Sequence, residues 1–506
     1  MKTNRWIIVG GGTAGWIAAS ALAHQYRNQA VSITLVESSE IGTVGVGEAV
    51  IPPFITFIRN LGLDEQQFIA AVGGTFKLGI EFKNWRRQHH SYFHHFGDLG
   101  RPLNGNDFYH CFLHAGRAGD CGDLMDYAPS AVMARQHRFF LPFKLAPDSG
   151  LNGANYALHF DASRVAAELR RFACDAGVKR VDAKVERVLT DDAGTIQTLQ
   201  LSTGEQLDGD YFIDCSGFRS LLLGQTLNIP YDDWSDLLPC NSAAAVQSEH
   251  TGDTPPYTTA SAQDAGWIWR IPLQHRMGNG YVFSNDYISD DEACASLLAQ
   301  LTGKPLHDPR ILRFTTGMRQ QLWAKNCIAL GLAGGFLEPL ESTAIHLVTR
   351  GVQFLLQLLP TVATTETQCQ ALAAEYNQRM RADYEEIRDF LVLHYCLTER
   401  DDSPFWRYVR DMPLPASLKH RLALFDASGQ LPPENDELFR KPSWQAVLHG
   451  MGRRPAHYHP AVDQLDAAQV NQALNAARQQ MANACQQLPT HNEFIQQFCA
   501  TPQAAQ

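Results

Sequence analysis

The sequence lacks any long hydrophobic run. Its longest largely apolar patches, such as 354–359, are far shorter than the roughly 20 residues that cross a bilayer. The first residues pass directly into a strand-like run, without the apolar h-region and small-residue cleavage site of a secretory signal. We therefore predict no membrane segment and no export, and expect a cytoplasmic protein.

Metal-binding and disulfide patterns are also missing. The 11 cysteines include no C-x-x-C pair, and the 19 histidines form no H-E-x-x-H arrangement, so we expect free thiols and no metal. Acidic residues outnumber basic ones, 53 against 42, and a net charge of −11 disfavours nucleic-acid binding. What is present is a globular composition, 45% hydrophobic over 506 residues, which suits roughly two or three structural units.

A glycine-rich loop near the start is the clearest motif. It reads Gly10-Gly11-Gly12-Thr13-Ala14-Gly15, and it lies between an apolar strand and a helix in a strand–helix–strand pattern over 6–36. In a G-x-G-x-x-G loop the first glycine makes the turn, the second admits a pyrophosphate, and the third lets helix and strand pack. Glu37 ends the second strand, where an acid can bind ribose hydroxyls.

Two later segments separate FAD from NAD as the expected dinucleotide. Residues 210–217 (DYFIDCSG) and 327–335 (CIALGLAGG) each read as a strand followed by a turn of small residues. Returning strand–turn units of this kind fit long, interrupted FAD folds better than a compact NAD domain. We expect FAD, with Gly331 in the second of these turns among the residues that hold it.

The predicted fold class is α/β with mixed α+β character. An FAD-binding Rossmann-like module is expected over 1–365, with inserted substrate-layer segments at about 75–160 and 225–310. A mostly helical C-terminal portion is expected over 366–506. Periodicity predicts helices at 164–177, 343–359, 369–398 and 467–498, and strands at 181–188, 196–201, 211–213 and 327–331.

Three further segments resemble the flavin-dependent halogenases that act on tryptophan and related indoles. Residues 266–272 (GWIWRIP) match the family's W-x-W-x-I-P signature, 75–79 (TFKLG) carry its catalytic lysine, and 338–343 (EPLEST) match its P-L-E-S-T turn. The segments 45–49 (GVGEA) and 93–96 (FHHF) also resemble family segments. The matches lie in order and span most of residues 1–410.

The resemblance implies a two-component enzyme. FADH2 from a separate flavin reductase, O2 and a halide ion would yield hypohalous acid, which reaches a small electron-rich aromatic such as indole or tryptophan. Lys77 would meet the acid, either as a hydrogen-bond donor or as a haloamine. Glu341 would orient the oxidant or take the ring proton, although by itself it also reads as an acid at a helix N-terminus. A homodimer is the base-rate expectation.

Most of the remaining site residues follow from the same resemblance. His94 and Phe96 are expected to form an aromatic wall at the substrate, although a structural histidine is the alternative reading. Trp444 lies where the match to the family is lost; it is a candidate pocket aromatic, with plain packing as the main alternative. Trp267 and Trp269 lie two apart on a predicted strand, so they share one face and would form a partition between flavin and substrate.

The expected halide site opens the helix predicted at 343–359. Thr343 and Ala344 would offer backbone N–H groups to the anion, and Gly47 of the early glycine segment would contact the cofactor. The family often has glycine where this chain has Ala344, and alanine tolerates positive φ less well. We therefore expect a different backbone nest, and bromide accepted at least as readily as chloride.

Two other functions compete with halogenation. An aromatic-ring hydroxylase would oxidise NAD(P)H itself and would not need Lys77, whereas a non-catalytic flavoprotein would turn nothing over. The combination of Lys77, Glu341 and the tryptophan pair favours a halogenase. The C-terminal third does not match the segment by which tryptophan-specific members hold the amino-acid head group, so indole or another heteroarene is favoured over free tryptophan.

Overall fold

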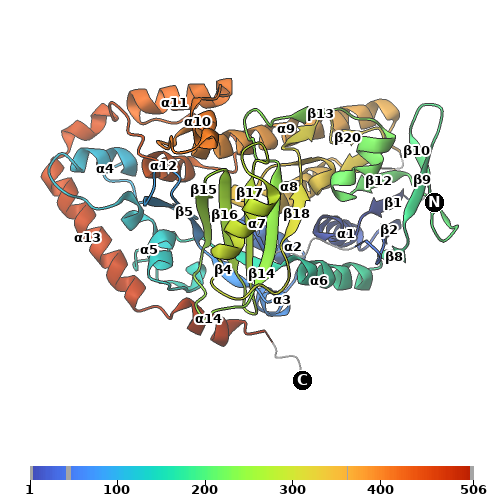
Figure 1. Cartoon of the computed structure of the whole chain (residues 1–506), viewed down its shortest axis with the longest axis horizontal. Helices are drawn as coiled ribbons and strands as arrows, with labels where there is room; N and C mark the ends of the chain where they lie inside the picture. The colour runs from blue at the N-terminus through green and yellow to red at the C-terminus, as the bar shows by residue number, and fades with distance from the viewer. Residues whose placement is uncertain (1–3, 42–46, 362, 502–506) are drawn as a thin grey trace. The chain divides into compact units, whose positions relative to one another are not determined.

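The computed structural model describes residues 4–41, 47–361 and 363–501 (Figure 1). The chain divides into two compact units that alternate along the sequence. Unit 1 comprises Met1–Val72, Phe160–Ser235 and Arg313–Glu385, and unit 2 comprises Gly73–His159, Asp236–Leu312 and Glu386–Gln506. The predicted domain boundary at 365/366 stays a prediction.

Unit 1 is built on a six-stranded sheet. In sheet order its strands are β20 (Trp323–Ala324), β21 (Cys327–Ala329), β12 (Tyr211–Asp214), β1 (Asn4–Val9), β2 (Val31–Glu37) and β8 (Lys179–Asp182). All neighbours pair in parallel except β20 with β21. The parallel strands are short apolar runs because helices cover them. The buried helix α1 (Thr13–Tyr26) connects β1 to β2 and lies against α6 (Ala162–Asp175) and α8 (Ala344–Gln357).

Smaller elements complete unit 1. The helices are α2 (Pro53–Asn60), α3 (Glu65–Val72) and the first part of α9 (Glu366–Cys396), and β3 (Gly47–Ala49) is an early strand. Two three-stranded sheets are β11 (Gln206–Asp208), β10 (Ile196–Leu201) and β9 (Val185–Thr190), and β13 (Tyr231–Asp233), β19 (Gly317–Arg319) and β22 (Gly335–Phe336). The strand predicted at 181–188 is two strands, β8 and β9, that belong to different sheets.

Unit 2 contains a seven-stranded, mainly antiparallel sheet. Its order is β18 (Arg310–Arg313), β14 (Ser242–Ser248), β17 (Met277–Phe283), β16 (Gly266–Pro272), β15 (Thr258–Gln263), β5 (Gly79–Lys83) and β6 (Ser91–His95). Separately, β4 (Thr75–Lys77) pairs antiparallel with β7 (Ala157–Asp161). Side chains alternate along β16: Ile268 joins a core with the helix α7 (Asp290–Ala299), so its two tryptophan neighbours face the opposite side.

The helices of unit 2 differ from the predicted set. Besides α7 they are α4 (Phe108–Ala115), α5 (Pro129–Arg135), α10 (Pro404–Asp411), α11 (Ala416–Ser428), α12 (Lys441–Gly450), α13 (Ala467–Gln486) and α14 (His491–Phe498). The single helix predicted at 467–498 is wrong: Pro489 has no N–H to continue a helix, and Thr490 forms a capping box that starts α14. Helix α7, capped by Ser289, lies in the inserted segment at 225–310, where no helix was predicted.

The predicted fold class, α/β with mixed elements and a Rossmann-like nucleotide-binding module, is confirmed. No helix in the described ranges is both long and apolar enough to cross a bilayer. Within the same ranges, no group of three or more His, Cys, Asp or Glu side chains is placed to hold a metal ion. The cytoplasmic location and the lack of a metal stay predictions.

Candidate active site

The glycine loop of unit 1 follows β1 and lies against the carboxyl end of the neighbouring parallel strand, β12. Gly10 has φ +116°, and a Cβ there would overlap the carbonyl oxygen of Cys215, which follows β12. A Cβ at Gly15 would overlap the carbonyl oxygen of Gly10. Both positions therefore require glycine, for the turn and for the approach of α1 to β1.

Gly12 differs because it faces open space. A Cβ at Gly12 would meet no described atom within 4 Å, and its φ of −74° suits any residue. Among the described residues no side chain caps α1, so the N–H groups of its first turn, at Thr13 and Ala14, are available. An uncapped helix N-terminus beside an open backbone fits the pyrophosphate of a dinucleotide.

Three other predicted cofactor residues lie in the same unit. Glu37 ends β2 with its carboxylate against Gly11, and it bonds to Arg180. Gly331 has φ +64°, and a Cβ there would lie 3.1 Å from that of Ala14, so this turn approaches α1 closely. Gly47 is buried at the start of β3, whereas the predicted Gly45 and Val46 lie outside the described residues. Contact with the cofactor stays a prediction for all three.

The turn before α8 carries the predicted acid and halide residues. Glu341 is 0% exposed at the end of a 3₁₀ turn, Pro339–Glu341, and Ser342 has φ +60°. Thr343 is the N-cap of α8, yet its buried Oγ1 hydrogen-bonds to nothing in the described part of the chain. An uncapped helix start with an unused hydroxyl fits an anion. Ala344 is already helical, so the left-handed position is Ser342 and the expected effect of Ala344 on the backbone is not supported.

His346 lies in the first turn of α8 and was not predicted from sequence. Burial and the charge of Arg350 lower the pKa of His346 to about 3, so its imidazole is neutral. Its Nδ1 is buried without a hydrogen-bond partner among the residues that the structure describes. A single histidine on an apolar helix face gives no sequence signal, which explains the omission.

In unit 2, Lys77 is the last residue of β4 and is 0% exposed. Its Nζ lies 5.2 Å from the ring centroid of Phe96. The backbone N–H of Phe96 donates to the carbonyl of Leu78, at 2.9 Å, which holds the two segments together. A buried ammonium is costly unless it is used or paired, and an aromatic face partly offsets that cost.

His94 and Phe96 form an aromatic wall next to Lys77. Their ring centroids are 6.5 Å apart at the end of β6, and His94 also lies 5.4 Å from Phe390 and 6.0 Å from Phe439. The structure thus brings three of the predicted residues of this unit together. Phe390 and Phe439, which stack at 3.8 Å, were missed because aromatic residues on helices and loops usually indicate core packing.

Trp444 belongs to the same aromatic cluster but is farther along it. It is 1% exposed, its ring centroid lies 5.0 Å from that of Phe390 in a T-shaped arrangement, and the guanidinium of Arg421 lies 4.2 Å from its ring centroid. Its Nε1–H donates to the carbonyl of Phe439 at 3.0 Å. These contacts support packing of the wall, and contact of Trp444 with substrate stays a prediction.

The predicted tryptophan pair lies on one face of β16. The ring centroids of Trp267 and Trp269 are 6.2 Å apart, and both side chains are buried. Gly280 of β17 pairs with Trp269, and a Cβ there would overlap its indole, so this glycine makes room for the ring. The pair forms a rigid slab, as a partition requires.

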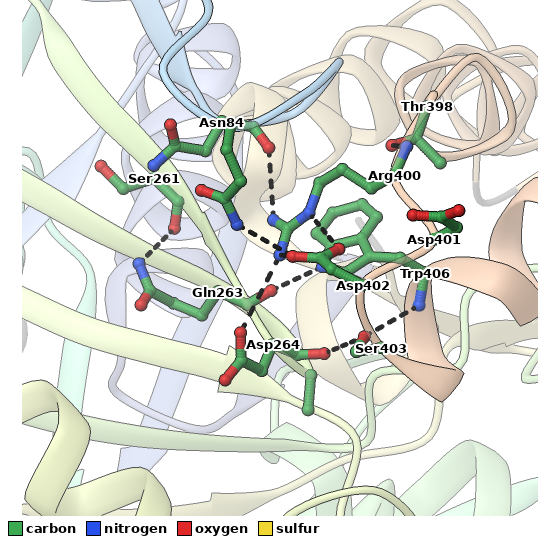
Figure 2. A network of polar contacts seen from close by, with 12 residues as sticks. Asn84, Ser261, Gln263, Asp264, Thr398, Arg400, Asp401, Asp402, Ser403 and Trp406 are labelled. Atoms are coloured by element: carbon green, nitrogen blue, oxygen red, sulfur yellow. Dashed lines mark hydrogen bonds and ion pairs between the residues drawn. The ribbon is translucent and has the colours of Figure 1, made fainter.

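A polar network holds the turn that precedes β16 (Figure 2). Arg400 is 3% exposed and donates to both carboxylate oxygens of Asp402, at 2.9 and 2.8 Å, and to the carbonyl of Asn84. Its guanidinium also lies over Trp406, whose Nε1–H donates to the carbonyl of Gln263 at 2.6 Å. The segment after α9 is therefore fastened to the β15–β16 turn. The sequence carried no signal for this contact.

Comparison with known proteins identifies the family. The tryptophan halogenase family model matches residues 5–467. A tryptophan 6-halogenase of Streptomyces toxytricini is 34% identical over 97% of this chain and 98% of its own length. A tryptophan 7-halogenase of Lentzea aerocolonigenes is 32% identical over 98% and 99%, respectively.

Solved structures agree with this assignment. A flavin-dependent halogenase from Xanthomonas campestris superposes with a TM-score of 0.94 at 45% identity, covering 99% of both chains. Another, from a Brevundimonas species, superposes with a TM-score of 0.93 at 41% identity, over 98% of this chain and 99% of its own. With a nucleotide-binding loop in unit 1 and a buried lysine among aromatic rings in unit 2, the chain belongs to the tryptophan halogenase family and is a flavin-dependent halogenating enzyme.

Proposed function

We propose that this enzyme uses FADH2, O2 and bromide or chloride to halogenate a small electron-rich aromatic such as indole or tryptophan. The observation that carries the proposal is Lys77, a fully buried ammonium facing an aromatic ring. Membership of the family favours halogenation over the aromatic hydroxylase and the non-catalytic flavoprotein. The relatives named as tryptophan 6- and 7-halogenases support an indole ring as substrate.

FAD is the flavin that the glycine loop fits. Gly10, Gly12 and Gly15 would hold its pyrophosphate, and Glu37 its ribose hydroxyls. When bound and reduced, the flavin supplies the chemistry that converts halide and O2 to hypohalous acid. The sequence contains a single such loop, so the electrons would come from a separate flavin reductase. A homodimer and a cytoplasmic location remain part of the proposal.

Lys77 would activate hypohalous acid by hydrogen bonding. The ammonium donates a hydrogen bond to the oxygen of the acid, which weakens the oxygen–halogen bond. An aromatic carbon of the substrate then takes the halogen, and the oxygen leaves as water with a proton from the ammonium. The Phe96 face stabilises the charged form of Lys77 that this role needs, in preference to a haloamine.

Glu341 would complete the substitution by accepting the proton that the halogenated ring must lose. Its side chain is fully buried, which suits a general base that acts in a site without water. Thr343 and Ala344 would bind the halide at the start of α8, and Trp267 and Trp269 would keep substrate away from the flavin. His94, Phe96 and Trp444 would surround the substrate ring.

The test is a halogenation assay read by mass spectrometry. Purified protein receives FAD, a generic flavin reductase, NADH and air, and indole and tryptophan are offered separately, each with bromide and with chloride. We expect a product with the isotope pattern of the halogen, with indole the better substrate. A hydroxylated product would instead indicate a monooxygenase. Absence of both organic product and trapped hypohalite would contradict the proposal.

A further inference from the structure

The strand that carries Lys77 is held by the last helix of the chain. The backbone N–H of Phe76 donates to Nε2 of His491, at 3.1 Å, across a sequence separation of 415 residues. His491 is the first residue of α14 and is 1% exposed. Residue 76 directly precedes Lys77, so this bond fixes the backbone immediately before the lysine.

The partners of His491 define its protonation state. A backbone N–H can only donate, so Nε2 must carry a lone pair, and the carbonyl of Thr254 can only accept, so Nδ1 must carry the proton. The Nδ1–O distance is 2.7 Å. Burial lowers the pKa of His491 to about 4, which agrees with a neutral ring. His491 is therefore a neutral bridge between two backbone groups.

Aromatic packing presses α14 against the same strand. Phe494 and Phe498 of α14 lie 5.4 and 6.0 Å from the ring of Phe76, which also stacks on Phe139 at 4.2 Å. Neighbouring side chains of a strand point to opposite faces. The Phe76 ring therefore points to α14, and the Lys77 side chain to the other face, where Phe96 lies.

Both ends of α14 are tied down. Thr490 caps its first turn through a reciprocal bond pair with Glu493. After the helix, the carbonyl of Cys499 and the backbone N–H of Thr501 bond to the amide of Gln274, at 3.0 and 2.8 Å. The same Gln274 amide donates to the carbonyl of Gly74, at 2.7 Å, just before β4 begins. The segment after α14 is thus linked through Gln274 to the residue that precedes β4.

A second buried histidine supports the preceding residue of β4. The hydroxyl of Thr75 donates to the carbonyl of Pro272 at 2.7 Å, so it must accept from Nδ1 of His159 at 3.0 Å. The other nitrogen of His159 bonds to Thr258. Burial and the positive charge of Lys77 lower the pKa of His159 well below its usual range, so this ring is neutral too. Each residue from 74 to 76 therefore has a hydrogen bond to another segment, and these bonds hold the backbone that leads to Lys77.

We propose that His491 is a positioning residue for Lys77, and that helix α14 acts through it to aim the ammonium at hypohalous acid. The inference rests on the proposed function and adds the residue that fixes the position of the Lys77 ammonium. A displacement of about 1 Å from a reacting group can reduce turnover by about 100-fold. Loss of the hydrogen bond between Phe76 and His491 should therefore leave formation of hypohalous acid unchanged and reduce its transfer to the substrate.

Two substitutions of similar polarity test this role. In His491→Gln the side-chain amide reaches the place of Nε2 and can still accept from Phe76. In His491→Asn the amide reaches only the place of Nδ1, which keeps the bond to Thr254 and loses the bond to Phe76. His114→Asn is the control, since His114 is also buried in unit 2 and bonds to Tyr458 and the carbonyl of Leu465, outside the β4 support.

The readout is the ratio of halogenated indole to hypohalite caught by a scavenger, together with the rate of FADH2 oxidation. We expect His491→Asn to lower the ratio on the order of tenfold at an unchanged oxidation rate, with the ratio retained in His491→Gln and His114→Asn. A wild-type ratio in His491→Asn, or an equal fall in all three variants, would overturn the proposal.

Amide hydrogen exchange provides a readout that does not need activity. Exchange at the backbone N–H of Phe76 should be faster in His491→Asn than in wild type and close to wild type in His491→Gln. If wild type yields no halogenated product, the proposed function fails while this measurement still decides the contact. Unchanged exchange in His491→Asn would show that His491 does not hold the strand.

Discussion

Lys77 combines complete burial with a positive charge, and its Nζ lies over the ring of Phe96. Burial of an ammonium lowers stability because its desolvation is costly, so a buried lysine is expected where its charge serves function. A lysine that served only the fold would be replaced with advantage by an apolar residue. At Lys77 we therefore expect the requirement for activity to conflict with the requirement for stability.

Lys77→Met should remove halogenation and leave oxidant formation intact. Methionine is unbranched like lysine, slightly shorter, and lacks the donor, so FADH2 oxidation and trapped hypohalite should stay near wild type while halogenated indole falls below detection. Lys83→Met, an exposed lysine on β5 that pairs with Glu81, is the matched control and should change nothing. Retained product in Lys77→Met would remove the lysine from the mechanism.

Glu341→Gln should slow turnover without altering the fold. The substitution keeps the shape of the side chain in a fully buried site and removes the proton acceptor. We expect turnover with indole to fall by about 100-fold or more, as for loss of a general base, with hypohalite still formed. Turnover close to wild type would assign Glu341 to the start of α8 instead.

At the scale of elements, two glycines of the G-x-G-x-x-G loop are required for different reasons, one for the fold and the other for the ligand. Gly10 serves the fold, since its conformation and the carbonyl of Cys215 exclude a side chain. Gly12 has neither constraint, so what keeps a side chain away from it would be the ligand. The two positions should therefore respond differently to the same substitution.

Gly10→Ala should destabilise the protein, and Gly12→Ala should weaken only cofactor binding. Strain and overlap at Gly10 should cost about 3 kcal/mol of the free energy of unfolding. Gly12→Ala should unfold like wild type but bind FAD about 10-fold more weakly, which is roughly 1.4 kcal/mol. Denaturant unfolding and flavin titration measure the two effects. Wild-type FAD affinity in Gly12→Ala would place the pyrophosphate elsewhere.

The Arg400 network stabilises the β15–β16 turn and should make stability depend on pH. Arg400→Met should lower the free energy of unfolding by about 2–4 kcal/mol at pH 7. The hydrogen bond from Arg400 lowers the pKa of Asp402 below its ordinary value of 3.8, so this stabilisation is present above that pH and is lost as pH falls. The difference between wild type and variant should therefore shrink in acid.

Arg410→Met is the control for that prediction. Arg410 pairs with Asp411 on the surface of the neighbouring helix α10, in an exposed contact of 2.9 Å. Exposed pairs contribute little to stability, so this variant should unfold like wild type at every pH. An equal loss in both variants would mean that burial of Arg400 is irrelevant.

At the scale of the whole molecule, each unit is assembled from three separated segments. The chain passes between the units at residues 72/73, 159/160, 235/236, 312/313 and 385/386, and the last crossing falls inside the continuous helix α9. If one unit unfolded, the segments of the other unit would lose the folded connections between them. The sequence order therefore couples the two units even though each has its own sheet.

Thermal unfolding should consequently occur in one transition. FAD at about 100 times its Kd should stabilise the protein by about 2.7 kcal/mol and move the whole transition upward. Differential scanning calorimetry, with and without FAD, measures this. Two resolved transitions, with only one of them shifted by FAD, would show that the units unfold independently.

Local patterns carried much of the fold and of the site. The strand–helix–strand unit at the start and the helix over α8 follow from apolar periodicity and glycine placement, which act within a few residues. Spacing alone put Trp267 and Trp269 on one face, because side chains of a strand alternate. The end of the helix at Gln486 and the start of α14 were missed. Pro489 indicates the first boundary, and the Thr490–Glu493 capping box indicates the second.

By itself, the sequence determined the nucleotide loop, the segment that carries Lys77 and the family resemblance, since each depends on neighbours in the chain. Only the tertiary structure decided what surrounds Lys77. His491 bonds to the preceding residue, Phe76, across 415 residues, and Arg400 meets Asn84 across 316 residues. Such contacts leave no periodic trace, because a hydrogen bond between distant segments constrains one residue at each end and depends on how the whole core packs.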